Sequence, residues 1–381
     1  MYTSFYIHWP FCPYRCSYCP FTALAGQDEL MPTYHTALCN ELLLWKQDKK
    51  YELETLYFGG GTPSTYPENL MLDMSAILST VCSFNDECEI TIEVNPGTLS
   101  ASHSETWQKI GINRISLGVQ SLNSQTLTLL NRLHTYDDVK NALALLVGKF
   151  KSISIDLMIG LPGVSCLEWE KTLKEVCSWP IQHISIYLLT IHKCTPLYFQ
   201  LKQKNIKLPS TEETIRMFLC TQSYLQANGF EQYEISNFAK PGHRSRHNLK
   251  YWSHKPYLGF GLGACSFDGV TRSENTSSFT HYCSAIEQNS KPYESQEILS
   301  EEQILTEKIM LSLRLNTGLH LQQFNLSGTS INPAIKEFVD TLLHEQLVVC
   351  PTQDIVVLTP GGMLLENEIA TRFCMLFLKK I

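Results

Sequence analysis

The chain has 381 residues, of which 44% are hydrophobic and 18% are charged. These fractions exclude a largely disordered or collagen-like protein, and the length predicts two or three domains at roughly 150 residues each. The 30 Lys and Arg against 37 Asp and Glu give a net charge of −7, so we expect no nucleic acid partner. The sequence has neither a signal peptide pattern at its start nor a run of ~18 apolar residues. We therefore expect a soluble, cytoplasmic protein with no transmembrane segment.

Short apolar runs alternate with helix-length segments through the first half of the chain. Strands are expected at residues 5–9, 55–58, 90–94, 114–119, 152–158 and 183–188. Helices are expected between them at residues 34–49, 67–82, 101–110, 124–150 and 167–178. Six such strand–helix units predict an α/β fold with a parallel sheet that is buried on both faces.

The alternation ends after the sixth strand, and this change predicts the domain boundaries. A helix at 211–227 precedes a stretch rich in aromatic residues and glycine, and then a run of clustered Ser, Thr, Asn and Gln. We expect a first domain at residues 1–270, a polar linker at 271–298 and a C-terminal domain at 299–381.

The C-terminal domain is predicted to be mainly helical. Helices are expected at 299–315, 333–345 and 363–379, with two short strands around Val348 and Val356. Helices with a two-stranded ribbon resemble a winged helix. Residues 297–381 contain six Lys or Arg and ten Asp or Glu, a net charge of −4, so a packing or substrate-covering role is favoured over DNA binding.

Three cysteines directly after the first predicted strand form the strongest chemical signal. Cys12, Cys16 and Cys19 have C-x3-C-x2-C spacing in the loop CPYRCSYCPF. Cysteine thiolates hold iron–sulfur clusters, and three ligands would leave one iron open for chemistry. The alternatives are a zinc site with His8 or His35 as the fourth ligand, or three incidental thiols.

Further polar residues recur at the carboxyl ends of the predicted strands. They are Gly60, Gly61 and Thr62 in a glycine run, Glu93, Gln120, Asp156 and Thr190. In parallel α/β proteins this end of the sheet carries the functional site. The glycine run either lets a backbone approach a ligand closely or forms a simple turn. Glu93 and Asp156 lie in apolar strands, so each requires a partner, which is either a ligand group, Arg132 or an internal salt bridge.

Several motifs in one order resemble the radical S-adenosylmethionine (SAM) superfamily. They are CPYRCSYC, FGGGTPS, IEVNPGT, GINRISLGVQS followed by NRLHT, IDLMIGLPG, YEISNFAKPG, HNLKYW and, near the C-terminus, LTPGGMLLENE. The resemblance covers nearly the whole chain. It is strongest to the branch that holds oxygen-independent coproporphyrinogen III oxidase and the HemW-type heme chaperones. The fold it implies is a partial (βα)6 TIM-like barrel with a C-terminal HemN-type, mainly helical and winged-helix-like domain.

The resemblance also implies cofactors and site residues. Cys12, Cys16 and Cys19 would ligate a [4Fe–4S] cluster whose fourth iron is chelated by S-adenosylmethionine, and a reduced cluster would permit cleavage to a 5′-deoxyadenosyl radical. The other implied cofactor positions are Tyr6 and Tyr18 beside the cofactor, Gly60, Gly61 and Thr62 at the methionine amine, Glu93 at hydroxyl or amine groups, and Gln120, Arg132, Asp156 and Thr190 at the remaining contacts.

Two absences separate this chain from the oxidase branch. No extension precedes the first predicted strand, and Cys19 is followed by Pro20 and Phe21 where the oxidase has a further cysteine. The HNLKYW segment instead matches the HNxxYW motif that is associated with heme binding in the chaperone branch, which makes His247 a candidate heme ligand. The alternative for His247 is an ordinary hydrogen-bonded histidine. Cys265, where an Ala-His-Ser pattern is common, is either a buried hydrophobe beside the cofactor or a thiolate ligand of heme iron.

The sequence therefore predicts a heme chaperone with heme, client hemoproteins and an electron donor for the cluster as partners. Transient contact with membrane hemoproteins fits this role. The alternative is an oxygen-independent coproporphyrinogen III oxidase, which removes carbon dioxide from propionate side chains by radical chemistry. A third, weaker class is a zinc-stabilised scaffold. S-adenosylmethionine cleavage is compatible with the first two classes, whereas the two absences argue against coproporphyrinogen oxidase activity.

Overall fold

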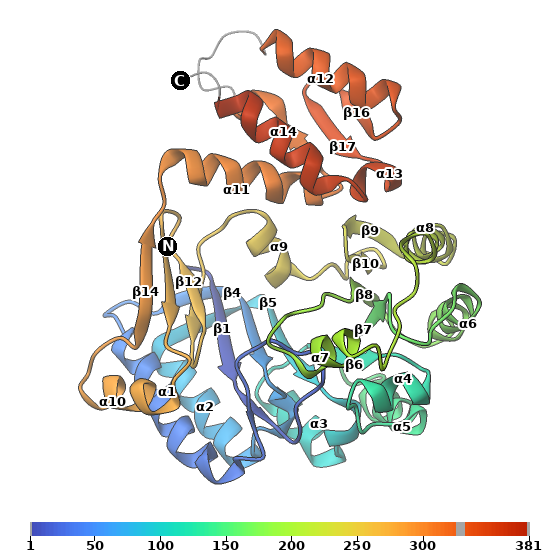
Figure 1. Cartoon of the computed structure of the whole chain (residues 1–381). Coiled ribbons are helices and arrows are strands. Elements are labelled where there is room, and N and C mark those ends of the chain that lie inside the picture. The colour runs from blue at the N-terminus through green and yellow to red at the C-terminus, as the bar shows by residue number, and fades with distance from the viewer. Residues whose placement is uncertain (1, 325–331, 379–381) are drawn as a thin grey trace.

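A nine-stranded sheet forms the centre of the first domain in the computed structural model, which describes residues 2–324 and 332–378 (Figure 1). In spatial order the strands are β11 (Leu258–Phe260), β1 (Ser4–Trp9), β4 (Tyr51–Gly60), β5 (Cys82–Val94), β6 (Arg114–Gln120), β7 (Ser152–Ile159), β8 (His183–Leu188), β10 (Asn237–Ala239) and β9 (Glu231–Glu234). The first seven are parallel, and β10 and β9 are antiparallel to their neighbours. In the described residues β11 and β9 do not pair with each other, so the barrel is partial.

The six strands expected from the sequence are confirmed as β1, β4, β5, β6, β7 and β8. Their burial explains why the sequence revealed them. In β7, for example, every residue is buried except the half-buried Asp156. A parallel strand that is covered on both faces requires such a continuous apolar run.

Helices surround this sheet on its outer side (Figure 1). They are α1 (Met31–Leu44), α2 (Glu68–Val81), α3 (Ala101–Lys109), α4 (Ser124–Leu129), α5 (Tyr136–Leu146), α6 (Cys166–Cys177) and α8 (Thr211–Ala227). The short helix α7 (Pro196–Lys202) instead lies against the cysteine loop, where the Leu197 N–H donates to the Ser17 carbonyl at 2.9 Å. The expected single helix over 124–150 is wrong, because the chain breaks into α4 and α5. Asn131 has a φ of 54°, and Thr135 caps α5 by accepting a hydrogen bond from the Asp138 N–H. The loop between the two helices carries Arg132.

The expectation of a polar linker at 271–298 is also wrong. These residues form β13 (Thr271–Asn275), α10 (Phe279–Glu287) and β14 (Tyr293–Ile298), and the two strands join β12 (Cys265–Phe267) in an antiparallel sheet. The segment is attached to α1 through the buried carboxylate of Glu41. That carboxylate accepts hydrogen bonds from the Gly261 N–H at 2.7 Å, Asn275 Nδ2 at 2.7 Å and the Tyr282 hydroxyl at 2.6 Å. Clustered polar residues indicated a loop here, but they serve this network and an exposed strand face.

The mainly helical, winged-helix-like C-terminal region is confirmed. It consists of α11 (Glu301–Arg314), β15 (Leu319–His320), α12 (Pro333–His344), β16 (Val348–Thr352), β17 (Ile355–Leu358), α13 (Pro360–Met363) and α14 (Glu366–Leu378). Its core is separate from that of the barrel and includes Ile309, Val356 and Phe373. The last expected helix, 363–379, is divided between α13 and α14, and Lys379 lies outside the described residues.

Helix α11 connects this region to the barrel domain through ion pairs. Glu307 accepts hydrogen bonds from Arg272 Nη2 at 2.7 Å and from His254 Nε2 at 3.0 Å. Arg314 Nη2 lies 3.2 Å from the buried Glu234 carboxylate. These contacts position α11 beside a cavity of the first domain that is described below.

Candidate functional site

The three clustered cysteines lie on one short loop that the rest of the barrel holds in place. Cys12 ends β2 (Phe11–Cys12), which pairs with β3 (Leu24–Ala25), and the loop between these strands carries Cys16 and Cys19. Ser17 attaches the loop to the end of α4 with two hydrogen bonds. Its main-chain N–H donates to the Leu130 carbonyl at 3.0 Å, and its hydroxyl donates to the Leu129 carbonyl at 3.0 Å. All three thiols are half-buried and line one cavity.

The spacing of these sulfur atoms favours a cluster over a single zinc ion. Among the described residues, the one set of His, Cys, Asp or Glu side chains that brings three ligand atoms within 4.8 Å of one another is His35, Cys39 and Asp73. At least one pair of the three cysteine sulfurs is therefore more than 4.8 Å apart. Sulfur ligands of one tetrahedral zinc ion are separated by about 3.8 Å, given Zn–S bonds of about 2.3 Å. As placed, the three thiols therefore do not form a compact site for one zinc ion.

Neither histidine considered as a fourth zinc ligand joins the cysteines. His35 Nδ1 contacts the Tyr66 hydroxyl at 2.7 Å, and its Nε2 lies 2.9 Å from Asp73. His8 bonds through Nε2 to the Thr22 carbonyl at 3.1 Å. Burial lowers the pKa of His8 to about 4, so this ring is neutral at physiological pH.

A cavity of about 500 Å³ opens beside the cysteine loop at the carboxyl ends of the parallel strands. Most of the site residues expected from the sequence line it together, namely Cys12, Cys16, Cys19, Tyr18, Gly60, Gly61, Thr62, Glu93, Gln120, Arg132, Asp156 and Thr190. These residues come from five parallel strands or the turns directly after them, from the cysteine loop and, for Arg132, from the loop between α4 and α5. The parallel topology brings them together, as expected for a site of this fold.

Two carboxylates in this cavity are protonated more easily than usual. Burial raises the pKa of Glu93 to about 7, and the neighbouring Asp156 adds to this effect. Glu93 accepts hydrogen bonds from the Tyr57 hydroxyl at 2.8 Å and from the Gly60 N–H at 3.1 Å. Burial also raises the pKa of Asp156 to about 6, while the Ser116 hydroxyl donates to it at 3.0 Å. Both carboxylates therefore favour a cationic or hydrogen-bond-donating ligand.

Arg132 adds a positive charge to the same cavity that holds the carboxylates of Glu93 and Asp156. Its guanidinium donates to the Gly118 carbonyl and contacts Cys16 Sγ at 3.7 Å. Its Nε is buried and has no hydrogen-bond partner among the described residues. A buried, unpaired N–H is costly, so this atom indicates an anionic or polar ligand group in the cavity.

The glycine run is required by the protein's own backbone. A Cβ at Gly61 would lie 2.5 Å from the Pro10 carbonyl oxygen, and Gly60 has a φ of 118°. Gly61 N–H donates to the Trp9 carbonyl at 2.8 Å, and the Thr62 hydroxyl reaches Cys12 Sγ at 3.5 Å. The glycine run therefore lets the end of β4 pack closely against the start of the cysteine loop. A simple turn would not need this close contact.

Tyr6 and Cys265 lie in a second cavity of about 620 Å³ that adjoins the first. The two cavities share Pro20, Phe21, Gly60 and Glu93. The second cavity extends between the barrel, β12 and α11. Its remaining lining includes Tyr251, Tyr257, Phe267, Lys255, Arg272 and Glu307.

His247 is placed differently from the other expected residues, because it is not among the lining residues of either cavity and is 1% exposed. Its ring nitrogens contact the Thr55 hydroxyl and the Tyr251 hydroxyl, both at 2.8 Å. Iron coordination by this residue thus requires one of these contacts to break. Burial lowers the pKa of His247 to about 3, so the ring is neutral.

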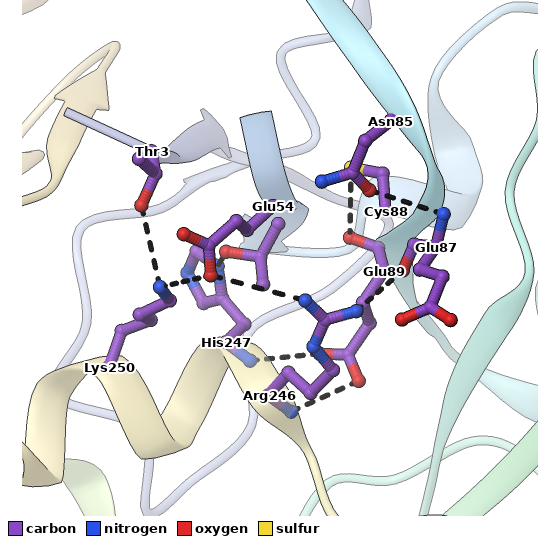
Figure 2. A network of polar contacts seen from close by, with 10 residues as sticks. Thr3, Glu54, Asn85, Glu87, Cys88, Glu89, Arg246, His247 and Lys250 are labelled. Atoms are coloured by element: carbon purple, nitrogen blue, oxygen red, sulfur yellow. Dashed lines mark hydrogen bonds and ion pairs between the residues drawn. The ribbon is translucent and has the colours of Figure 1, made fainter. Parts of the chain in front are cut away.

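Figure 2 shows how His247 is fixed at the start of α9 (Arg246–Trp252). The main-chain N–H groups of Arg246 and His247 donate to the two carboxylate oxygens of Glu89 at 3.0 and 2.9 Å. Glu54 in turn forms ion pairs with Lys250 and Arg246. A carboxylate that accepts the first N–H groups of a helix stabilises that helix end.

Comparison with known proteins gives the family. The Radical SAM superfamily domain matches residues 6–176, and the HemN C-terminal domain matches residues 299–365. The heme chaperone HemW of Bacillus subtilis is 34% identical over 376 residues, which cover 97% of this chain and 98% of the relative. The chain belongs to the HemW family. Radical S-adenosyl methionine domain-containing protein 1, mitochondrial, of Danio rerio is 33% identical over 86% of this chain and 76% of its own length.

The solved structure of coproporphyrinogen III oxidase (HemN) from Escherichia coli shares the fold of this HemW-family protein. It superposes with a TM-score of 0.83 at 23% identity, and the match covers 98% of this chain and 89% of that chain. The radical SAM domain implies a [4Fe–4S] cluster and S-adenosylmethionine, and the three thiols and the unpaired Arg132 Nε fit these groups. Within the described residues, none of the helices is both long and apolar enough to cross a membrane.

Several cavity residues of this HemW-family protein were missed by the sequence analysis. Tyr57, Ser116 and Ser185 line the first cavity from inside apolar strands. Ser116 is the register partner of Glu93, and Ser185 is the partner of Asp156. The two serines could have been found from the sequence. Each is the register partner of a predicted carboxylate in the neighbouring parallel strand.

Proposed function

We propose that this protein binds heme and delivers it to client hemoproteins, with a [4Fe–4S] cluster and S-adenosylmethionine taking part in the transfer or its control. The observation that carries this proposal is the second cavity of about 620 Å³, which adjoins the cofactor cavity. Flat aromatic surface from Tyr251, Tyr257 and Phe267 suits a porphyrin face. The heme chaperone relative from Bacillus subtilis, similar over nearly the full chain, supports the same function.

In this proposal the first cavity holds the cluster and S-adenosylmethionine. Cys12, Cys16 and Cys19 ligate iron, and when bound the cluster supplies one-electron chemistry. The roles of the other residues are those that the family resemblance implies, and charge supports two of them: Glu93 receives the methionine amine and Arg132 the methionine carboxylate. Gly60, Gly61 and Thr62 lie with Glu93 at the amine, and Gln120, Asp156 and Thr190 take the remaining contacts. Tyr18 borders the cofactor from the cysteine loop, and Tyr6 borders it from the second cavity.

The second cavity offers groups that suit both the propionates and the iron of heme. Lys255 provides a cation for one propionate, and Arg272 provides the second when it exchanges its ion pair with Glu307 for the ligand. Cys265 is half-buried and lines the cavity, so its sulfur can reach iron without a rearrangement of the barrel. His247 becomes a ligand only after its contact with Thr55 or Tyr251 is released. We therefore assign Cys265 as the first iron ligand and keep His247 as a second, conditional one.

Heme titration of anaerobically reconstituted protein tests this assignment. We expect one heme per chain, and we expect the Cys265→Ser protein to show a shifted absorption spectrum and weaker binding. Cys350→Ser is the matched control, because Cys350 is also half-buried but lies in the C-terminal region. Identical spectra for wild type, Cys265→Ser and His247→Ala would contradict both assigned ligands.

Delivery is tested with an apo-hemoprotein such as apomyoglobin as the acceptor. We expect heme to move from the loaded protein to the acceptor, at a rate that changes when S-adenosylmethionine is added. We place the protein in the cytoplasm with an electron donor for the cluster. Retention of heme against a large excess of acceptor would contradict the delivery function.

Coproporphyrinogen III oxidase is the second candidate, favoured by the shared fold with HemN. Anaerobic incubation with coproporphyrinogen, reductant and S-adenosylmethionine separates the two functions. The chaperone proposal predicts unchanged coproporphyrinogen. A decarboxylated product would instead assign the second cavity to a porphyrinogen substrate.

A further inference from the structure

A second group of metal-binding side chains lies outside the cofactor cavities and joins α1 to α2. His35 and Cys39 are four residues apart on α1, which places them on one face of the helix, and Asp73 comes from α2. His35 Nε2 lies 2.9 Å from Asp73 Oδ2 and 3.6 Å from Cys39 Sγ. All three ligand atoms are within 4.8 Å of one another.

The His35–Cys39 separation of 3.6 Å fits two ligands of one small ion, and the 2.9 Å His35–Asp73 hydrogen bond must open slightly to admit that ion. Tetrahedral zinc, with bonds of about 2.0 Å to nitrogen or oxygen and about 2.3 Å to sulfur, places its ligand atoms roughly 3.3–3.6 Å apart. His35 and Cys39 are 4% and 7% exposed and are fixed by packing. The Asp73 side chain is 59% exposed, so it can open the His35–Asp73 contact by a small movement and admit an ion from solvent.

The second ring nitrogen of His35 has a buried partner that suits a metal-bound histidine. Histidine ligands of metal ions usually donate their second ring N–H to a fixed acceptor, which sets the tautomer. Without metal, His35 Nε2–H donates to Asp73 at 2.9 Å and Nδ1 accepts from the buried Tyr66 hydroxyl at 2.7 Å. A metal ion on Nε2 moves the ring proton to Nδ1, and the Tyr66 oxygen then accepts it. The Tyr66 ring is itself stacked on Trp9, with centroids 3.7 Å apart.

We propose that His35, Cys39 and Asp73 bind one Zn²⁺ ion, with water as the fourth ligand. Mixed imidazole, thiolate and carboxylate donors favour Zn²⁺ over Mg²⁺ or Ca²⁺. Binding replaces the Cys39 S–H bond with a zinc–sulfur bond and releases the proton to solvent. This site is separate from the proposed heme chemistry, so each can fail without the other.

The position of the site gives it a structural role toward the cluster loop. Trp9, stacked on Tyr66, donates through Nε1 to Thr65 Oγ1 at 3.2 Å. Thr65 Oγ1 donates to the Thr62 carbonyl at 2.8 Å, and Thr62 Oγ1 contacts Cys12 Sγ at 3.5 Å. A zinc ion between α1 and α2 would brace the turn that adjoins the first cluster ligand.

The test is the zinc content of the full-length protein after anaerobic cluster reconstitution, when iron occupies the three loop cysteines. After incubation with Zn²⁺ alone and removal of loosely bound metal, we expect one zinc per chain in addition to the cluster iron. Asp73→Asn, at an exposed position, should lower zinc affinity at least tenfold and leave the iron content unchanged. Cys39→Ser should lower the zinc affinity further than Asp73→Asn does.

Two matched variants separate this result from general effects. Asp48→Asn changes another exposed aspartate, and Cys82→Ser changes another buried cysteine. Both should bind zinc as the wild type does. Zinc should also raise the thermal midpoint of the wild type but not that of Asp73→Asn. No retained zinc in the wild type, or equal zinc affinity in wild type and Asp73→Asn, would overturn the proposal.

Discussion

The imidazole of His247 stacks on the ring of Tyr57, with ring centroids 4.9 Å apart and an interplanar angle of 27°. Tyr57 then donates its hydroxyl hydrogen to Glu93 at 2.8 Å. A histidine of the HNLKYW motif is thereby connected, through one tyrosine, to a carboxylate of the cofactor cavity. We therefore expect substitution of His247 to affect the cofactor cavity through Tyr57 and Glu93.

This connection predicts that His247→Ala destabilises the protein in the absence of heme. The substitution leaves the Thr55 and Tyr251 hydroxyls without their partner and opens a void beside Tyr57. We expect a loss of about 2–4 kcal/mol in the free energy of unfolding. Chemical denaturation measures it, with Tyr251→Phe as a milder control at about 1 kcal/mol. Unchanged stability together with lost heme binding would show that His247 acts as a ligand alone.

A second prediction concerns the pH dependence of S-adenosylmethionine binding. Burial holds the pKa of Glu93 at about 7 in the free protein. A cationic amine binds the ionised carboxylate better than the protonated one, so affinity should rise from pH 5.5 through about 7 and level off roughly one pH unit above that pKa. Equilibrium dialysis with labelled S-adenosylmethionine over this range measures the profile.

The matched variant for this profile is Glu93→Gln, which keeps the shape of the side chain and removes its titration. We expect weaker binding and a flatter profile, with a remaining slope near pH 6 from Asp156, whose pKa burial raises to about 6. If the variant kept the full slope between pH 6 and 7, Glu93 would not be the group that meets the amine.

Arg132 gives a third prediction, because its buried Nε lacks a partner among the described residues. Arg132→Lys keeps the charge but loses the planar pair of donors that suits a carboxylate. We expect at least a tenfold loss of S-adenosylmethionine affinity, since a charged hydrogen bond contributes about 1.5–3 kcal/mol. Binding to the reconstituted protein, with its iron content determined in parallel, measures this loss. Equal affinity of wild type and Arg132→Lys would exclude Arg132 from contact with the ligand.

The sequence predicted the parallel strands well because burial on both faces leaves a continuous apolar run, as in β7. It predicted several of the cavity residues because parallel strands place their carboxyl ends at one edge, so Glu93 and Asp156 had to lie near each other. The break between α4 and α5 was missed, although the capping box from Thr135 to Asp138 marks the start of a new helix.

Other features depend on contacts between distant parts of the chain, which local patterns do not contain. The segment from Thr271 to Ile298 read as a linker because its polar residues face solvent or Glu41, a partner more than two hundred residues away. The enclosure of His247 depends likewise on Thr55 and Glu89. No spacing within HNLKYW distinguishes a buried, hydrogen-bonded histidine from a ligand that faces a cavity.

The Glu41 network leads to the last prediction, which concerns stability and pH. Three donors converge on this fully enclosed carboxylate, yet burial still raises its pKa to about 7, above the usual value of 4.5. Because the folded state binds the proton more tightly than the unfolded state, this group favours folding below pH 4.5, and its contribution is lost as pH rises from 4.5 to about 7. Glu41→Gln should remove this part of the pH dependence and cost about 1–2 kcal/mol, whereas Glu41→Ala should cost about 2–4 kcal/mol. Denaturation curves of the three proteins between pH 5 and 8 test this, and parallel pH profiles for wild type and Glu41→Gln would show that Glu41 stays ionised in the folded protein.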